Sequence, residues 1–197
     1  VFRDGHEGLQ ALGVRPMMTL VIGGAASGKS EFAESLCLAG PGPRVYVATM
    51  DASGEAGARR VARHRALREG KGFQTLERAR DVEALAPQVP AECTLLLEDV
   101  GNLVANELFA GTSPCALDAD GAASSALRGI EALVAVADDA VVVTVDVFRD
   151  GVRYDEGTEA WRRALAQVNA RVAARADKIV EVVCGIPVWV KGEGATR

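Results

Sequence analysis

The chain has 197 residues, of which 49% are hydrophobic and 25% are charged, a composition that supports a buried core and excludes general disorder. It carries 22 basic and 27 acidic residues, a net charge of -5, whereas nucleic-acid-binding domains normally present a net basic surface. No apolar run approaches the roughly 18–20 residues of a membrane span, and no secretory signal opens the chain. We therefore expect a cytoplasmic globular protein with no nucleic-acid partner and no membrane span. Its four scattered cysteines are expected to be small buried hydrophobes: Cys37, Cys93, Cys115 and Cys184.

Short apolar runs rich in β-branched residues alternate with longer segments of helical periodicity along the chain. Residues 1–16 precede the first such run and are interpreted as a peripheral N-terminal extension, whereas residues 17–197 contain no Pro- or Ser-rich linker and are expected to form one domain. Fully apolar strands that alternate with helices are typical of a parallel sheet covered on both faces, so the fold class is α/β. The predicted strands cover 19–22, 44–48, 95–97, 141–145, 179–183 and 188–190, and the predicted helices cover 29–38, 55–69, a segment through 104 and 108, 121–137 and 158–176.

A glycine-rich turn between the first strand and the first helix matches GxxxxGK[ST] at every fixed position. In this context the glycines let successive backbone N–H groups point at phosphates, and the helix N-terminus adds its partial positive charge. Lys29 would reach the β- and γ-phosphates, and the Ser30 hydroxyl would bind Mg²⁺. A chance glycine-rich turn would rarely satisfy both motif and context, so we predict a P-loop NTPase-like fold. The predicted phosphate site comprises Gly23, Gly24, Ala25, Ala26, Ser27, Gly28, Lys29 and Ser30.

Two acidic residues, Glu98 and Asp99, directly follow the apolar strand 95–97. A carboxylate at the carboxyl end of a neighbouring parallel strand is where a P-loop fold holds its metal- or ribose-directed acid. The pattern does not say which of the two points into the ligand crevice. An ordinary solvated strand end is the alternative interpretation.

His64 is the only histidine beyond residue 16, and it lies among arginines on the predicted helix 55–69. Arg60 and Arg68 flank it at i-4 and i+4 on one helix face. Because cationic neighbours disfavour the imidazolium form, this histidine is expected to stay neutral and available as a nucleophile. The same arginines could gather phosphates. A solvated basic helix face with an incidental histidine is the alternative.

Together these residues resemble the adenosylcobinamide kinase/adenosylcobinamide-phosphate guanylyltransferase family of cobalamin biosynthesis, over about residues 18–192. The similarity is carried by the P-loop segment 19–30, the strand Val45-Tyr46-Val47-Ala48-Thr49, the helix segment 58–65, the element from Leu96 to Asn106, and the closing segments 168–177 and 183–187. The resemblance implies that His64 attacks the α-phosphorus of GTP, releases pyrophosphate and passes GMP to adenosylcobinamide phosphate.

The same resemblance implies a kinase step, in which GTP or ATP with Mg²⁺ phosphorylates the corrinoid substrate adenosylcobinamide, and a homotrimer. His64 and Lys29 would be the catalytic residues, and Ser30 and Glu98 would hold the metal. Beyond the P-loop, the implied nucleotide contacts are Ala48, Thr49, Met50, Arg65, Ala66, Leu67, Arg68, Glu77 and Glu98.

The chain departs from the family pattern after the strand 141–145. Where the family usually reads TNEVG, this sequence has Val145, Asp146 and Phe148 in place of the asparagine, the glutamate and the glycine, so an amide that could hold a substrate or a phosphate is absent. Two alternatives stay open. A P-loop kinase of another small metabolite would transfer a γ-phosphate without a guanylylated intermediate, and a non-catalytic nucleotide-binding subunit would bind a triphosphate without turnover.

Overall fold

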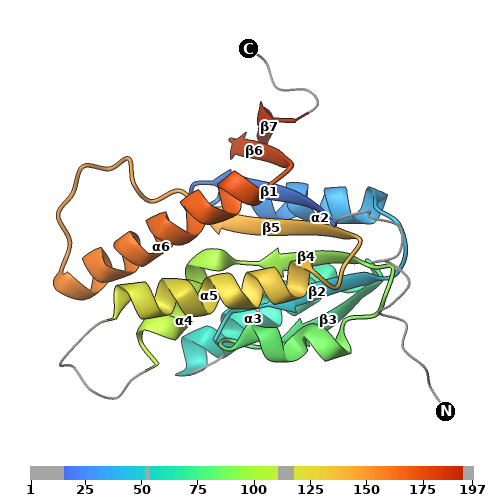
Figure 1. The fold of residues 1–197 in the computed structure, drawn as a ribbon, viewed down its shortest axis with the longest axis horizontal. Coiled ribbons are helices and arrows are strands. Elements are labelled where there is room, and N and C mark those ends of the chain that lie inside the picture. The colour runs from blue at the N-terminus through green and yellow to red at the C-terminus, as the bar shows by residue number, and fades with distance from the viewer. Residues whose placement is uncertain (1–15, 52–53, 111–117, 193–197) are drawn as a thin grey trace.

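A seven-stranded sheet forms the centre of the computed structural model, which describes residues 16–51, 54–110 and 118–192 (Figure 1). The strand order is β3-β2-β4-β5-β1-β6-β7. All neighbouring strands are parallel except β6 and β7, which form an antiparallel hairpin. The strands are β1 (Met17–Gly23), β2 (Arg44–Ala48), β3 (Phe73–Glu77), β4 (Thr94–Glu98), β5 (Asp139–Val145), β6 (Lys178–Val183) and β7 (Ile186–Lys191).

Helices cover both faces of this sheet, as Figure 1 shows. One face packs against α4 (Val100–Leu108), α5 (Ala119–Val134) and α6 (Glu156–Arg175), with the 3-10 helix η1 (Val82–Gln88) beside α5. The other face packs against α2 (Lys29–Ala39), and α3 (Gly54–Arg68) connects β2 to β3. The predicted α/β class, with a mostly parallel sheet between helices, is confirmed.

The central strand β5 shows why the apolar runs form this sheet. Its residues alternate between the two cores: Ala140 and Val142 pack on the α4–α6 side, while Val141 and Val143 pack on the α2 side. Because both faces are buried, the strand carries β-branched residues at consecutive positions instead of alternating with polar ones.

The predicted elements agree with the structure to within a few residues, but β3 and η1 were not predicted. Strand β3 is an edge strand that pairs only with β2 among the described strands. Gln74, Thr75 and Glu77 are exposed there, so the segment lacks the apolar pattern that identified the central strands.

The prediction that the cysteines are buried is confirmed in part. Cys37 and Cys93 are buried as expected, but the prediction is wrong for Cys184, which is exposed in the turn between β6 and β7. Cys115 lies outside the described residues. No helix within the described ranges is long and apolar enough to cross a membrane.

The strand register brings the predicted site residues to one edge of the sheet. Ala48 at the end of β2 is paired with Glu98 of β4 on one side and with Glu77 of β3 on the other. Gly23, where the P-loop begins, is paired with Val145 at the end of β5. The carboxyl ends of the parallel strands therefore meet at the crevice where α/β proteins bind ligands.

Candidate nucleotide-binding site

The P-loop occupies the turn from β1 into α2. Gly28, the N-cap residue of α2, has φ of 89°, and a Cβ atom there would lie 3.2 Å from the Cα of Gly185. The Gly185 N–H donates a 2.8 Å hydrogen bond to the Ser27 carbonyl, which ties the loop to the β6–β7 turn. Both the positive φ and the close approach of two backbones require glycine at position 28.

A cleft opens beside this loop at the carboxyl ends of β2 and β4. It is bounded by the start of α2, by α4 and by α3. Seven of the predicted site residues line it, together with four that were not named as site residues. The lining consists of Lys29, Ser30, Ala48, Met50, Arg68, Glu77 and Glu98, and of Tyr46, Val61, Asp99 and Asn102.

Of the two acids at the carboxyl end of β4, Glu98 is the one directed at the P-loop. Its Oε1 accepts a hydrogen bond from the Ser30 hydroxyl, and its Oε2 accepts one of 2.9 Å from the Tyr46 hydroxyl. Asp99 instead caps α4, because its Oδ1 accepts a 2.6 Å hydrogen bond from the Asn102 N–H. The interpretation of Glu98-Asp99 as an ordinary solvated strand end is therefore wrong.

The pair formed by Ser30 and Glu98 fits a magnesium ion. Both side chains offer hard oxygen ligands, and the structure brings them into direct contact within the cleft. Mg²⁺ is usually held by one or two such protein groups together with phosphate oxygens and water. Nearby, Lys29 Nζ donates a 3.2 Å hydrogen bond to the Gly24 carbonyl, which folds the ammonium group over the phosphate-binding turn.

Tyr46 keeps its proton in this environment. Burial, reinforced by the adjacent Glu98 carboxylate, raises the pKa of the Tyr46 hydroxyl far above its ordinary value. The hydroxyl therefore acts as a hydrogen-bond donor to the carboxylate.

The arginines of α3 separate into two environments. Arg68 is only 7% exposed, and its Cζ lies 3.9 Å from the centre of the Tyr46 ring, so a solvated basic face is the wrong interpretation for this residue. Arg65 lies at the surface, where Nε donates a 2.7 Å hydrogen bond to Glu77 and Nη2 makes a second contact with the same carboxylate. These hydrogen bonds lower the pKa of Glu77, which stays ionised at the rim of the cleft.

Position 64 lies within α3, between Val61 and Arg68, which both line the cleft. Gly57, Val61 and Arg68 are the buried positions described on this helix, and residue 64 falls between them at helical spacing, three residues after 61 and four before 68. The side chains of Arg60, His64 and Leu67 lie outside the described part of the chain.

Two other predicted contacts lie apart from the cleft lining. The Thr49 side chain is buried, and its hydroxyl exchanges two 2.8 Å hydrogen bonds with the backbone of Asp99, so it joins the ends of β2 and β4. Ala66 is exposed on α3.

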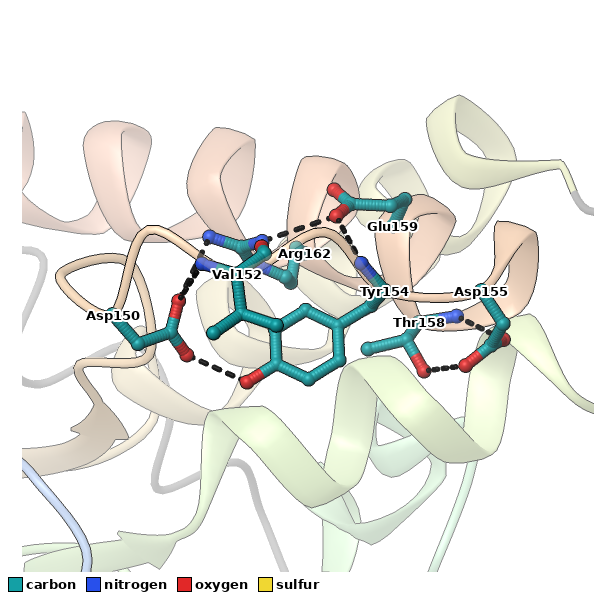
Figure 2. Close-up of polar contacts among 7 residues, drawn as sticks. All are labelled: Asp150, Val152, Tyr154, Asp155, Thr158, Glu159 and Arg162. Atoms are coloured by element: carbon teal, nitrogen blue, oxygen red, sulfur yellow. Dashed lines mark hydrogen bonds and ion pairs between the residues drawn. The ribbon is translucent and has the colours of Figure 1, made fainter.

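The residues that follow the departing positions 145–148 form a local network with the start of α6, which Figure 2 shows. The Tyr154 hydroxyl donates a 2.6 Å hydrogen bond to Asp150, and Asp155 caps α6 by accepting from the Thr158 N–H at 3.0 Å. Arg162 lies over the Tyr154 ring, with Cζ 5.3 Å from its centre. The segment from β5 to α6 is therefore tied to the first turns of α6.

At the end of β5, Val145 packs against apolar surroundings. A Cβ on Gly101 would lie 2.9 Å from Val145 Cγ1, and Trp161 packs against the same core. Asp146 and Glu181 both pair with the Arg149 guanidinium, at 2.6 and 2.9 Å. The residues that replace the family's asparagine and glutamate thus take part in packing and ion pairing.

Some lining residues were missed because their roles depend on distant partners. Tyr46 lies in the strand that resembles the family's second strand, but its contact with Glu98 joins residues 52 positions apart. Asn102 and Val61 stand within elements that were predicted as helices, and only the packing of those helices shows that the two residues reach the cleft.

A P-loop followed by a helix, a hydroxyl at the first turn of that helix and a facing carboxylate on a parallel strand define the class of P-loop nucleotide-binding proteins. The family model for cobinamide kinase / cobinamide phosphate guanyltransferase matches residues 19–190. The chain belongs to this family.

Curated relatives cover most of the chain. The bifunctional adenosylcobalamin biosynthesis protein CobU of Salmonella typhimurium LT2 is 33% identical over 184 residues, and that of Escherichia coli K12 is 32% identical, each covering 89% of this chain and 100% of the relative. The corresponding protein CobP of Pseudomonas aeruginosa PAO1 is 28% identical over 90% of this chain and 99% of its own. A solved Pyrococcus horikoshii OT3 structure shares the fold alone, with a TM-score of 0.53 and 8% identity over 96% of both chains.

Proposed function

We propose that this chain phosphorylates adenosylcobinamide and transfers GMP from GTP to adenosylcobinamide phosphate, which gives adenosylcobinamide-GDP for cobalamin biosynthesis. The observation that supports this function is the cleft itself, which is lined by Lys29 of the P-loop, by Glu98 and by Arg68 of α3. In this proposal residues 17–197 act as one catalytic domain in the cytoplasm, and residues 1–16 are peripheral to it.

His64 is the proposed nucleophile of the guanylyl transfer. An imidazole nitrogen attacks the α-phosphorus of GTP, the bond to the oxygen that bridges the α- and β-phosphorus atoms breaks, and pyrophosphate leaves with the electron pair. A phosphate oxygen of the acceptor then attacks the same phosphorus, the P–N bond breaks and the imidazole is restored. One difficult transfer thereby becomes two easier ones. Val61 and Arg68 of α3 line the cleft three residues before and four residues after position 64, and this spacing supports the role.

Two cations are available for the phosphates. Lys29 and Arg68 both line the cleft, and charge-assisted hydrogen bonds from such groups stabilise the charge that develops during transfer. Ser30 and Glu98 would hold Mg²⁺, which when bound neutralises phosphate charge. In the kinase step the substrate hydroxyl attacks the γ-phosphorus of GTP or ATP, the nucleoside diphosphate leaves, and the hydroxyl proton passes to solvent.

A homotrimer is also part of the proposal, and the edge strand β7 supports self-association. Ile186, Val188 and Val190 are 65%, 44% and 59% exposed, and their alternate spacing places them on one face of the strand. An exposed edge strand can pair with another chain, and a contiguous apolar surface can mark an interaction site. A second copy of this chain is the occupant we propose.

The intact mass of the protein after incubation with GTP and Mg²⁺, without any corrinoid, tests the covalent mechanism. The sample is kept basic, because a phosphoramidate survives alkali and is lost in acid. We expect a GMP-sized gain in the wild type and none in His64→Ala. His6→Ala, which changes the other histidine of the chain, is the matched control and should gain GMP like the wild type.

The absence of a gain in protein that binds GTP would refute the covalent mechanism. Turnover of adenosylcobinamide with ATP or GTP, followed by the formation of adenosylcobinamide phosphate, tests the kinase step separately. Transfer of the γ-phosphate only to a different metabolite would favour a simple P-loop kinase, and binding without any turnover would favour a non-catalytic subunit.

A further inference from the structure

Tyr46 lines the cleft and takes no part in the chemistry proposed above. It belongs to β2 and is only 2% exposed. Its side chain contacts two charged groups that line the cleft, the Glu98 carboxylate and the Arg68 guanidinium. We infer that Tyr46 is a positioning residue, which orients Glu98 through its hydroxyl and Arg68 through its ring; this inference rests on the nucleotide site of the proposed function.

The strand register explains how Tyr46 reaches the carboxylate. Tyr46 is paired with Leu96 of β4, so Glu98 is its diagonal neighbour on the same face of the sheet. An aromatic side chain spans this diagonal distance. Glu98 then receives the Ser30 hydroxyl on Oε1 and the Tyr46 hydroxyl on Oε2. A carboxylate held at both oxygens keeps one orientation toward Ser30, as groups behind a metal ligand commonly do.

The ring of Tyr46 holds the second group. Arg68 Nε is buried and has no hydrogen-bond partner among the described residues, and the guanidinium packs on the ring of Tyr46. The separation of 3.9 Å is within the range of a cation–π contact. Phe73 packs edge-on against the same ring, with centroids 5.7 Å apart and planes at 85°, which restrains the ring itself. Arg68 is thereby presented to the cleft as a phosphate-binding group.

The two contacts of Tyr46 predict two separable effects on GTP binding, measured by calorimetry in EDTA and over a magnesium titration. Tyr46→Phe removes the hydroxyl and retains the ring. We expect the affinity of this variant for GTP in EDTA to stay within about twofold of the wild type. Magnesium should increase that affinity, but the magnesium concentration needed for half of the increase should rise by about tenfold, as is typical when a group supporting a metal ligand is lost. Tyr46→Leu also removes the ring and should weaken GTP binding in EDTA.

The chain contains a matched control. Tyr154 is the other tyrosine, and its hydroxyl also donates to a carboxylate, that of Asp150, in the segment shown in Figure 2. Tyr154 is 42% exposed and does not line the cleft. Tyr154→Phe should therefore leave both the affinity in EDTA and the magnesium response unchanged.

A double-mutant cycle distinguishes positioning from a general structural effect. Glu98→Gln should weaken the magnesium response, and in that background Tyr46→Phe should add almost nothing, because the two residues act through one contact. Arg68→Met should lower the affinity in EDTA, and Tyr46→Leu should add little to it. Independent, additive losses in both cycles would overturn the inference.

A measurement on the wild type makes the test independent of how well the variants fold. With ring-labelled tyrosine, each of the two tyrosines gives its own set of NMR signals. The addition of Mg²⁺ to the GTP complex should shift the signals of Tyr46 and leave those of Tyr154 in place. A Tyr46 signal that does not move, or a Tyr46→Phe variant with the wild-type magnesium response, would overturn the inference alone. A wild type that binds no GTP would overturn the proposed function and this inference with it.

Discussion

Replacing Gly28 with alanine tests the geometry of the P-loop, with Gly24→Ala as the matched control. Gly28 has φ of 89°, and its new Cβ would lie 3.2 Å from the Cα of Gly185. At Gly24 the φ is not in the left-handed region, and no atom lies within 4 Å of the new Cβ. The two variants add the same methyl group to the same loop, so their effects on the unfolded chain are the same.

The expected loss of stability in Gly28→Ala follows from the positive φ and from the close contact with Gly185. A left-handed conformation costs an L-residue roughly 1–2 kcal/mol, and the tight backbone contact at position 28 adds to this cost. The reduced freedom of the unfolded chain contributes about 0.4–1 kcal/mol of stabilisation to both variants. We expect the free energy of unfolding of Gly28→Ala to lie about 2 kcal/mol below that of Gly24→Ala.

Urea unfolding, followed by the fluorescence of Trp161 and Trp189, measures this difference. With a urea m-value of about 2 kcal/mol/M, the midpoint of Gly28→Ala should lie about 1 M below that of Gly24→Ala. Binding of GTP should weaken as well in Gly28→Ala, because the first turn of α2 shifts. Equal midpoints for the two variants would show that neither the positive φ nor the contact with Gly185 constrains the loop.

Thiol labelling of the native protein should modify Cys184 quickly and spare the buried Cys37 and Cys93. Burial raises the pKa of the Cys37 thiol to about 12 and that of the Cys93 thiol to about 11, so neither is a ready nucleophile. Peptide mapping checks this prediction, and equal labelling of the three cysteines would contradict it. The hydrogen bonds from Arg65 lower the pKa of Glu77 in the folded protein. They therefore stabilise the fold at pH values above about 4.3, the pKa of an unfolded glutamate. This stabilisation is lost as the pH falls through the lowered pKa of the folded state. Urea midpoints of the wild type and Glu77→Gln should therefore differ by a constant amount above pH about 5 and converge in acid, whereas a difference that grows in acid would have the wrong sign. Val188→Asp should lower the mass measured by light scattering, because it charges the apolar face of β7; an unchanged oligomer would exclude this face from the interface.

Local patterns were sufficient to predict much of the fold and the phosphate site. The P-loop lies in one short segment whose glycine positions follow from local backbone conformation, as the positive φ of Gly28 shows. The strand 141–145 was recognisable because a strand buried on both faces carries apolar residues throughout. Strand β3 was missed because an edge strand has no such requirement, and Gln74 and Thr75 are exposed there.

Contacts between distant segments could be decided only by the tertiary structure. The residues Glu98-Asp99 are adjacent in sequence, and the choice between them depends on the turn into α4, which uses Asp99 as a cap and leaves Glu98 facing Ser30. The basic pattern of α3 predicted a helix with arginines on it, but the burial of Arg68 depends on Tyr46, 22 positions earlier and on a different element.

By itself, the sequence determined the class of fold, the P-loop and the family, because glycine geometry, hydrophobic periodicity and residue order along the chain are local or linear properties. The tertiary structure alone decided that Tyr46 contacts both Glu98 and Arg68. It also decided that Ala48 is paired with Glu77 on one neighbouring strand and with Glu98 on the other. Strand order and register determine these contacts, and they arise from the packing of the whole sheet, which no short segment encodes.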